Sequence, residues 1–129
     1  MQEIKSQWMK RVNVTQLIYS YLIFPIRSNK FIEICLDNYN FDANQIKIIE
    51  YFLTNKSEIE KQVNKYVKAG WNFERLNTVD QAIIYCAISE KNTLNTDKNI
   101  IIDESVKTAK NFSDIDSYEF INAILDKIL

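Results

Sequence analysis

The sequence predicts an all-α fold, and three observations lead to this expectation. The chain has 129 residues but only one glycine and one proline, whereas sheets and tight hairpins need more of both at their turns. Apolar residues recur at spacings of three and four, which place them on one face of a helix. The 47% hydrophobic content is enough for a core without metal or disulfide support. We therefore expect six or seven helices, in one domain or in two small subdomains that share a core.

The first helix is expected over about residues 4–24 and is apolar on two faces. One face carries Ile4, Trp8, Val12, Thr15, Tyr19 and Leu22. A second stripe, nearly opposite, carries Lys10, Val14, Leu17 and Tyr21. Such a helix is either central to the fold or shared with a partner, and the second stripe leaves a homodimer open. Pro25 ends the helix because proline disfavours helical backbone in the residue before it.

The middle of the chain predicts a short helix over residues 30–36 and a longer one that begins after Asp42. The Asp42 side chain can cap the exposed amides of the next turn. A bend or break is expected at residues 55–57. Gly70 suits the end of this region, where a left-handed residue is needed.

Three further helices are expected, from about residue 78, over residues 102–112 and over residues 116–129. Thr78 with Gln81 fits a capping box, and Asp116 with Glu119 resembles one. A polar loop is expected over residues 91–99. The apolar stripe of the last helix consists of Ile121, Ile124, Leu125 and Ile128.

The residue types exclude most catalytic chemistry. The chain has no histidine, which removes the usual general base and the imidazole metal ligand. Cys35 and Cys86 form no CxxC pair, and we interpret them as buried thiols of a protein in the reducing cytoplasm. A single glycine leaves no phosphate-binding loop. The sequence therefore predicts a cytoplasmic binding protein, with no enzymatic activity, metal site or cofactor.

Charge is distributed unevenly although the net charge is −1. The first 30 residues hold five basic residues and one acid, for +4, whereas the remaining 11 basic and 16 acidic residues give −5. A basic N-terminus on an acidic body is typical of phosphate contact, and a solvated helix face explains it equally well.

Three segments resemble the NusB transcription-antitermination family, in the family's order. The strongest is IDESVKTAKNF at residues 102–112, followed by DSYEFINAILDK at residues 116–127. It is similar to the family's Ile-Asn-Glu helix, Ala-Lys-x-Phe end and Phe-(Val/Ile)-Asn-Gly-(Val/Ile)-Leu-Asp-Lys helix. WNFERLNTVDQAII at residues 71–84 and Arg11 with LIYS at residues 17–20 are weaker matches. The resemblance implies two helical subdomains, of about residues 1–70 and 71–129.

The resemblance also implies a function. NusB proteins pair with NusE, a ribosomal protein of the small subunit, and hold the boxA element of ribosomal-RNA leader transcripts, so that RNA polymerase resists termination. Carried over to this sequence, the RNA-binding residues are Lys10, Arg11, Tyr66, Lys110, Phe112, Asp116 and Phe120. The residues that face NusE are Tyr19, Ile23 and Asp80. Cations would hold phosphates, and aromatic rings would stack on unpaired bases. Core positions for Phe112, Phe120 and Tyr19 remain alternatives.

The sequence departs from the family pattern at three places. The family opens its first helix with an arginine cluster, where this chain has SQWMKR at residues 6–11. Ile84 and Tyr85 replace a Leu-Arg pair, and Ala123 replaces a glycine. Fewer cations predict weaker RNA affinity or stronger dependence on the partner. The alternative function is a protein-interaction module whose RNA binding is weakened or lost. A related domain precedes ribosomal-RNA cytosine methyltransferases, but no glycine-rich cofactor loop is present here.

Overall fold

The structure, a computed structural model, describes residues 6–25, 28–38, 40–67 and 72–129. These residues form six α-helices and one short 3-10 helix, and no strand occurs among them, which confirms the all-α expectation. The elements are α1 (Gln7–Ile23), α2 (Ser28–Asn38), α3 (Ala43–Asn64), η1 (Phe73–Arg75), α4 (Thr78–Leu94), α5 (Lys98–Phe112) and α6 (Ser117–Ile128). No helix within the described ranges is long and apolar enough to cross a membrane.

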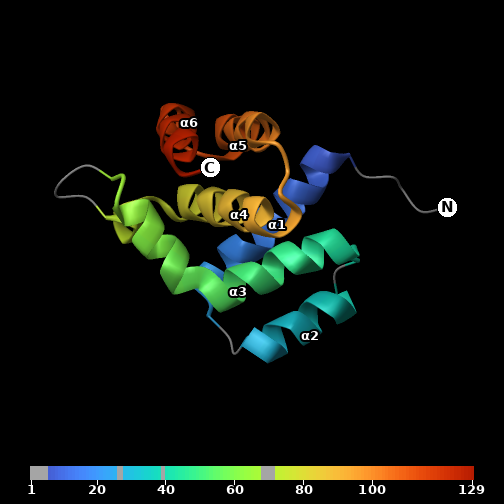
Figure 1. The fold of residues 1–129 in the computed structure, drawn as a ribbon. Helices are drawn as coiled ribbons and strands as arrows, with labels where there is room; N and C mark the ends of the chain where they lie inside the picture. Colours follow the sequence, from blue (N-terminus) through green and yellow to red (C-terminus); the bar gives the residue numbers. More distant parts are fainter. Residues whose placement is uncertain (1–5, 26–27, 39, 68–71) are drawn as a thin grey trace.

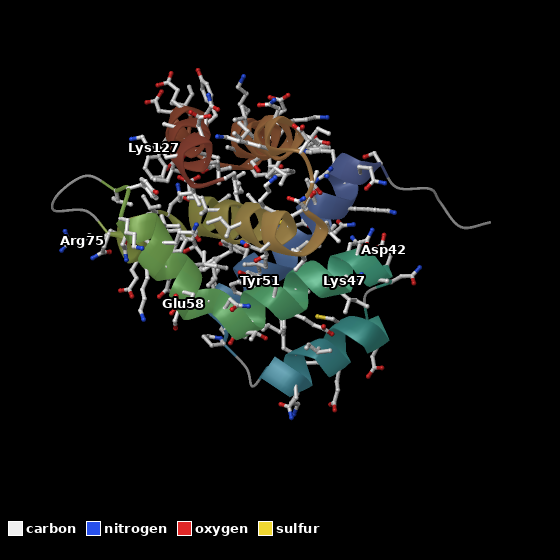
Figure 2. The ribbon with its side chains drawn as sticks, in the orientation of Figure 1. Asp42, Lys47, Tyr51, Glu58, Arg75 and Lys127 are labelled. Carbon is white, nitrogen blue, oxygen red and sulfur yellow. The ribbon has the colours of Figure 1, made fainter. Side chains whose placement is uncertain are left out.

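Helix α4 is the centre of the fold. It packs against α1, α3, α5 and α6, and every residue from 82 to 90 is buried. Helices α5 and α6 lie together on one side of α4, whereas α3 and then α2 lie on the other, and α1 passes behind (Figure 1). The outer surface of α3 carries exposed charged side chains such as Lys47 and Glu58 (Figure 2). Because α4 contacts helices from both halves of the chain, the two halves share one core. The subdomain boundary near residue 70 stays a prediction.

Helix α1 is central to the fold. Of the two interpretations of its two apolar faces, a central helix or one shared with a partner, the structure supports the first. Val12 and Thr15 of one stripe are buried, and so are Val14 and Leu17 of the other. The second stripe therefore packs inside the chain, which argues against a homodimer formed through it. The prediction that Tyr19 lies on the core face is wrong, because the exposed fraction of this residue is 37%.

Helix α3 begins and bends as expected. The Asp42 side chain accepts a hydrogen bond from the Gln45 backbone at 2.8 Å, and the Gln45 side chain accepts one from the Asp42 backbone at 2.8 Å. Asn55 leaves helical geometry, with φ −116° and ψ 15°, and its amide donates to the Tyr51 carbonyl. The predicted bend is therefore confirmed at Asn55. Gly70, and the expected helix start near Ile4, lie outside the described residues.

The loop expected over residues 91–99 is shorter than predicted. Helix α4 continues to Leu94, and α5 begins at Lys98, four residues before the expected start. Asn95 ends α4 in the left-handed region, with φ 50°, where asparagine is tolerated better than most residues. The Asp97 side chain caps α5 by accepting from the Asn99 backbone at 2.8 Å. The two short polar side chains thus allow a three-residue connection.

Both capping boxes predicted for the C-terminal half are wrong. The cap of α4 is Asn77, whose side chain accepts from the Asp80 backbone at 2.8 Å. Gln81 instead donates to the Leu76 carbonyl at 2.8 Å. At the start of α6, Asp116 makes no side-chain capping hydrogen bond. Asparagine and threonine are both accepted at a helix start, and here the backbone places the Asn77 oxygen beside the Asp80 amide.

Replacing Asn77 with alanine is expected to lower the free energy of unfolding by about 1–2 kcal/mol, because the first turn of α4 loses its acceptor and Asp114 loses a donor. Replacing Thr78 with alanine should change it by less than about 0.5 kcal/mol. Urea unfolding followed by circular dichroism measures both variants. A larger loss for Thr78→Ala than for Asn77→Ala would show that Thr78 is the cap after all.

The two cysteines are buried thiols, as the sequence indicated. Cys35 and Cys86 are both buried. Burial raises the pKa of Cys35 to about 11 and that of Cys86 to about 12. Both groups therefore stay protonated near neutral pH, and thiolate chemistry is disfavoured. The described residues contain no group of histidine, cysteine, aspartate and glutamate side chains that could hold a metal ion.

Candidate functional site

The connection between α5 and α6 is fixed against the start of α4. Asp80 is only 5% exposed, and its two carboxylate oxygens accept hydrogen bonds from Ser113 at 2.6 Å and from Ser117 at 2.9 Å. The Asn77 amide donates to the Asp114 carboxylate at 3.0 Å. These bonds order residues 113–117 before any ligand arrives, which lowers the entropic cost of binding there.

This arrangement bears on the role predicted for Asp80. Its carboxylate is buried and both oxygens are already bonded, so the structure does not favour direct contact with a partner. In the structure, the Asp80 carboxylate holds the α5–α6 connection in place through its hydrogen bonds to Ser113 and Ser117. The sequence could not show this, because Ser113 and Ser117 lie more than 30 residues further along the chain.

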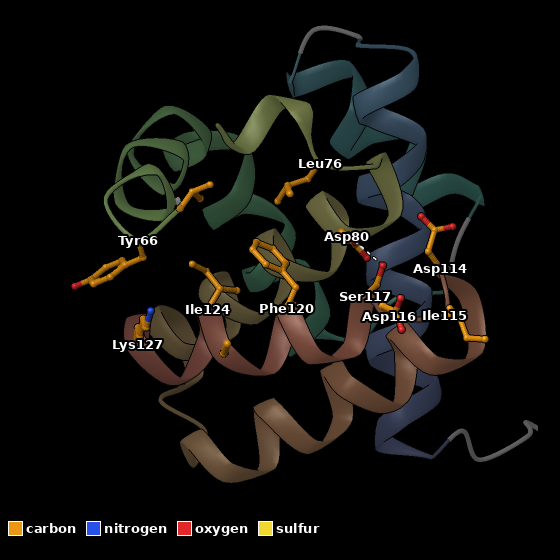
Figure 3. A pocket seen from close by; sticks show the side chains of 12 residues that line it. Tyr66, Leu76, Asp80, Asp114, Ile115, Asp116, Ser117, Phe120, Ile124 and Lys127 are labelled. Atoms are coloured by element: carbon orange, nitrogen blue, oxygen red, sulfur yellow. Dashed lines mark hydrogen bonds between the residues drawn. The ribbon is translucent and has the colours of Figure 1, made fainter. Parts of the chain in front are cut away.

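A pocket of about 550 Å³ opens beside this connection. Its walls come from the turn that follows α3, the start of α4 with the residues before it, the α5–α6 connection and one side of α6 (Figure 3). Phe120 projects into it, with Tyr66 and Lys127 at one end and Asp116 at the other (Figure 3). Phe120 is half-buried and packs against the core, whereas Tyr66 is exposed. The structure thus brings three of the predicted RNA-binding residues, Tyr66, Asp116 and Phe120, to one pocket.

Phe112 lies at the end of α5, next to Trp8 of α1. It is 51% exposed, so the alternative that it belongs to the core is wrong. The Trp8 ring stacks with it, with centroids 6.4 Å apart and planes 18° from parallel. The Trp8 indole donates to the Thr108 hydroxyl at 3.0 Å, and the Lys107 ammonium lies 4.1 Å from a Trp8 ring centroid. Sequence analysis placed Trp8 on the core face and missed this contact.

The Lys110 side chain on α5 contacts a side chain of α6. Its ammonium lies 4.6 Å from the centroid of the Tyr118 ring, a cation–π contact at the surface. The Tyr118 hydroxyl donates to the Glu119 carboxylate at 3.2 Å. Lys110 therefore remains at the surface, close to an aromatic side chain that sequence analysis had not selected.

The two cations predicted on α1 are both held in ion pairs. The Arg11 guanidinium donates twice to Glu90, at 2.8 and 2.7 Å, and once to Glu104 at 3.3 Å. The hydrogen bond to Glu90 raises the pKa of Arg11, although burial opposes this shift. Lys10 lies 2.9 Å from Asp42. The Arg11 side chain is 18% exposed, so the structure favours a structural role over phosphate contact.

The residues predicted to face NusE on α1 lie at the surface. Tyr19 and Ile23 are exposed and are four residues apart, so they share one face of the helix. Phe24 continues this surface and is more exposed than either. This apolar face is separate from the pocket, whose lining contains no residue of α1.

Comparisons with known proteins agree with this picture. A family model described as the NusB family matches residues 10–129. The chain belongs to the NusB family. It is 36% identical over 94 residues to the transcription antitermination protein NusB of Ligilactobacillus salivarius (strain UCC118), covering 72% of each chain. It is 30% identical over 90 residues to that of Macrococcus caseolyticus (strain JCSC5402), covering 70% of this chain and 68% of the relative.

Solved structures show the same fold. NusB of T. maritima superposes with a TM-score of 0.78 at 22% identity, covering 98% of this chain and 92% of that one. A conserved hypothetical protein from Mycoplasma genitalium, described as structurally homologous to NusB proteins, gives 0.77 at 22% identity, covering 97% and 100%. NusB proteins are transcription antitermination factors rather than enzymes, so the non-enzymatic expectation is confirmed.

The structure shows where two departures from the NusB pattern lie. Tyr85, which stands in place of an arginine, is fully buried, and its hydroxyl donates to the Glu60 carboxylate at 2.6 Å. Burial and this hydrogen bond raise the pKa of Tyr85, so it remains a neutral core residue. Ala123, in place of glycine, lines the pocket and adds only a methyl group. The first change therefore alters the core, and the second slightly narrows the pocket.

Proposed function

We propose that this NusB-family protein binds a boxA-like single strand of a ribosomal-RNA leader together with NusE. The observation that carries the proposal is the pocket at α6, which places aromatic side chains beside an ordered loop. Bases of single-stranded RNA bind proteins mainly by stacking on aromatic rings and by hydrogen bonds to their edges. Phe120 and Tyr66 would supply the first kind of contact, and Asp116 would accept hydrogen bonds from base amino groups.

The charges near the pocket suit an RNA held by bases more than by phosphates. Among the described residues that line the pocket, Lys127 is the one cation. The acids that line it are Asp80, Asp114 and Asp116. Lys107 and Lys110 are exposed on α5, outside the pocket lining. Each neutralised phosphate of a single strand contributes about −0.7 to the slope of log K against log salt. With three available cations, we expect a slope no steeper than about −2.

NusE would bind the exposed face of α1. Tyr19 and Ile23 offer an apolar surface there, and aromatic side chains of this kind are enriched where proteins meet. Asp80 would contribute indirectly, by holding residues 113–117 in place. A binary complex would therefore leave the pocket at α6 free for RNA.

A second candidate function is a protein-interaction module that has lost RNA binding. The observation in its favour is that Arg11 and Lys10 are both occupied by carboxylates. This function needs only the α1 surface. It predicts NusE binding that survives nuclease treatment, with no RNA in the complex.

One titration separates the two functions. The protein, alone and with NusE, is titrated against a fluorescently labelled boxA-like strand and a scrambled strand of equal composition, and anisotropy is recorded at low salt. We expect tighter binding of the boxA-like strand, most clearly with NusE present. Equal binding of both strands with NusE present would contradict the proposed function. Retained NusE binding in that case would support the interaction module.

A further inference from the structure

Three helices contribute aromatic and cationic side chains to the outer surface around α5. Trp8 comes from α1, Lys107 and Lys110 from α5 and Tyr118 from α6. Each lysine lies over one ring, Lys107 over Trp8 and Lys110 over Tyr118. We propose that Trp8, which the family resemblance does not assign, joins Phe112 in a second base-stacking platform for single-stranded RNA and so compensates for the missing arginines of α1. This proposal rests on the proposed function and extends its RNA surface beyond the pocket.

The geometry of the two rings suits a platform. Their planes are 18° from parallel and their centroids 6.4 Å apart, which is an offset stack. An offset leaves part of each ring uncovered by the other, and half of the Phe112 surface is exposed. The indole hydrogen bond to Thr108 fixes the orientation of the Trp8 ring. The platform is therefore ordered before RNA binds, and little side-chain entropy is lost on binding.

The cations beside the platform are available to phosphates. Lys107 and Lys110 are exposed and three residues apart, so they lie on neighbouring positions of α5. Neither makes an ion pair with a carboxylate in the part of the chain that the structure describes. Two acids lie one turn before Lys107 on α5. Glu104 is paired with Arg11, and Asp103 is exposed and makes no ion pair with Lys107 in the described part of the chain. A strand that stacks on Phe112 would thus pass two unpaired ammonium groups.

This surface fits single-stranded nucleic acid better than it fits a protein. Interleaved aromatic rings and cations follow the alternation of bases and phosphates along a strand. A protein-binding face is usually depleted of lysine at its centre, whereas Lys107 lies directly over the Trp8 ring. Stacking is tolerant of sequence, because every base has an aromatic face. The platform would therefore raise affinity without adding much sequence preference.

Trp8 offers a direct optical readout, because the chain has only one other tryptophan, Trp71. In a Trp71→Phe background, addition of the boxA-like strand to the complex with NusE is expected to quench the Trp8 emission. Trp8→Ala should weaken RNA binding at least about 5-fold while leaving the salt slope unchanged. Trp8→Phe should restore most of the affinity. Lys107→Ala should reduce the magnitude of the slope by about 0.7.

Met9→Ala is the matched control, since Met9 is the exposed neighbour of Trp8 on α1 and should leave the affinity unchanged. Urea unfolding of each variant shows which of them fold. If Trp71→Phe does not fold, the difference between the emission of the wild type and of Trp8→Phe gives the same readout. If Trp8→Ala does not fold, the quenching decides together with Trp8→Leu, which keeps apolar volume but has no aromatic face. Trp8→Leu that binds RNA as tightly as the wild type would refute the platform.

The outcomes distinguish this platform from the proposed function. If labelled RNA binds but the Trp8 emission does not change, the platform is refuted and the proposed function stands. If the emission changes on addition of NusE alone and not of RNA, the surface binds protein and the platform is likewise refuted. If the complex binds the boxA-like and the scrambled strand equally, the proposed function fails. The platform then stands if both strands still quench the Trp8 emission, and it is refuted if neither strand does.

Discussion

Replacing Arg11 with alanine is expected to lower the free energy of unfolding by about 3–5 kcal/mol. The reason is the carboxylate of Glu90, which is 2% exposed and accepts both of its short hydrogen bonds from Arg11. Without the guanidinium this charge stays buried and unpaired. Urea unfolding followed by circular dichroism gives the free energy, and the loss should appear as a lower midpoint with an unchanged slope.

The neighbouring residue supplies the control. Lys10 also pairs with a carboxylate, that of Asp42, but both side chains are at least one-third exposed. Lys10→Ala should therefore cost no more than about 1 kcal/mol. An Arg11→Ala variant as stable as Lys10→Ala, with weaker RNA binding, would instead show that Arg11 holds phosphate.

Replacing Phe120 with alanine is expected to weaken RNA binding by about 1–3 kcal/mol, which corresponds to about 5- to 150-fold. The side chain projects into the pocket (Figure 3), and the proposed function requires its ring to stack on an unpaired base there. Because it also packs against the core, the substitution will lower stability as well. Anisotropy with the boxA-like strand and NusE measures the affinity, and urea unfolding measures the stability.

Phe120→Leu separates the two effects. Leucine keeps most of the apolar volume, so stability should fall by less than about 1.5 kcal/mol. It has no aromatic face, so RNA affinity should still fall. If Phe120→Leu binds RNA as tightly as the unchanged protein does, Phe120 acts only as a core residue.

The helices could be predicted because their signal is local. Spacings of three and four located α1, α3 and α4, and Asp42 and Asn55 marked a start and a bend correctly. Helix ends were predicted less well, because Asn77 and Thr78 are both plausible caps in sequence. The choice between them follows from backbone geometry, which places the Asn77 oxygen 2.8 Å from the Asp80 amide.

The candidate site could be predicted only in part. The motif at residues 102–127 indicated Phe112, Asp116 and Phe120, which the structure places at the surface or in the pocket. The partners of Arg11 could not be predicted, because Glu90 and Glu104 are 79 and 93 residues away in sequence. A charged residue in sequence does not show whether its charge is free.

Trp8 was placed only partly correctly, for a related reason: it is half-buried against α5 rather than fully in the core. Helical spacing put it on the same face as Val12, and that face was assigned to the core. In the structure α1 reaches α5 at Trp8, where the indole finds the Thr108 hydroxyl and the Phe112 ring. Periodicity gives the face of a helix, whereas exposure at its end depends on which helix packs beside it.

The central claim is that RNA binds along the end of α5, the α5–α6 connection, α6 and the turn that follows α3. Amide chemical-shift mapping of isotope-labelled protein, bound to NusE and titrated with the boxA-like strand, tests it most directly. We predict that the largest shifts on RNA addition occur over residues 107–120 and at Tyr66. Largest shifts on the outer face of α3, around Lys47 and Glu58, would contradict the claim.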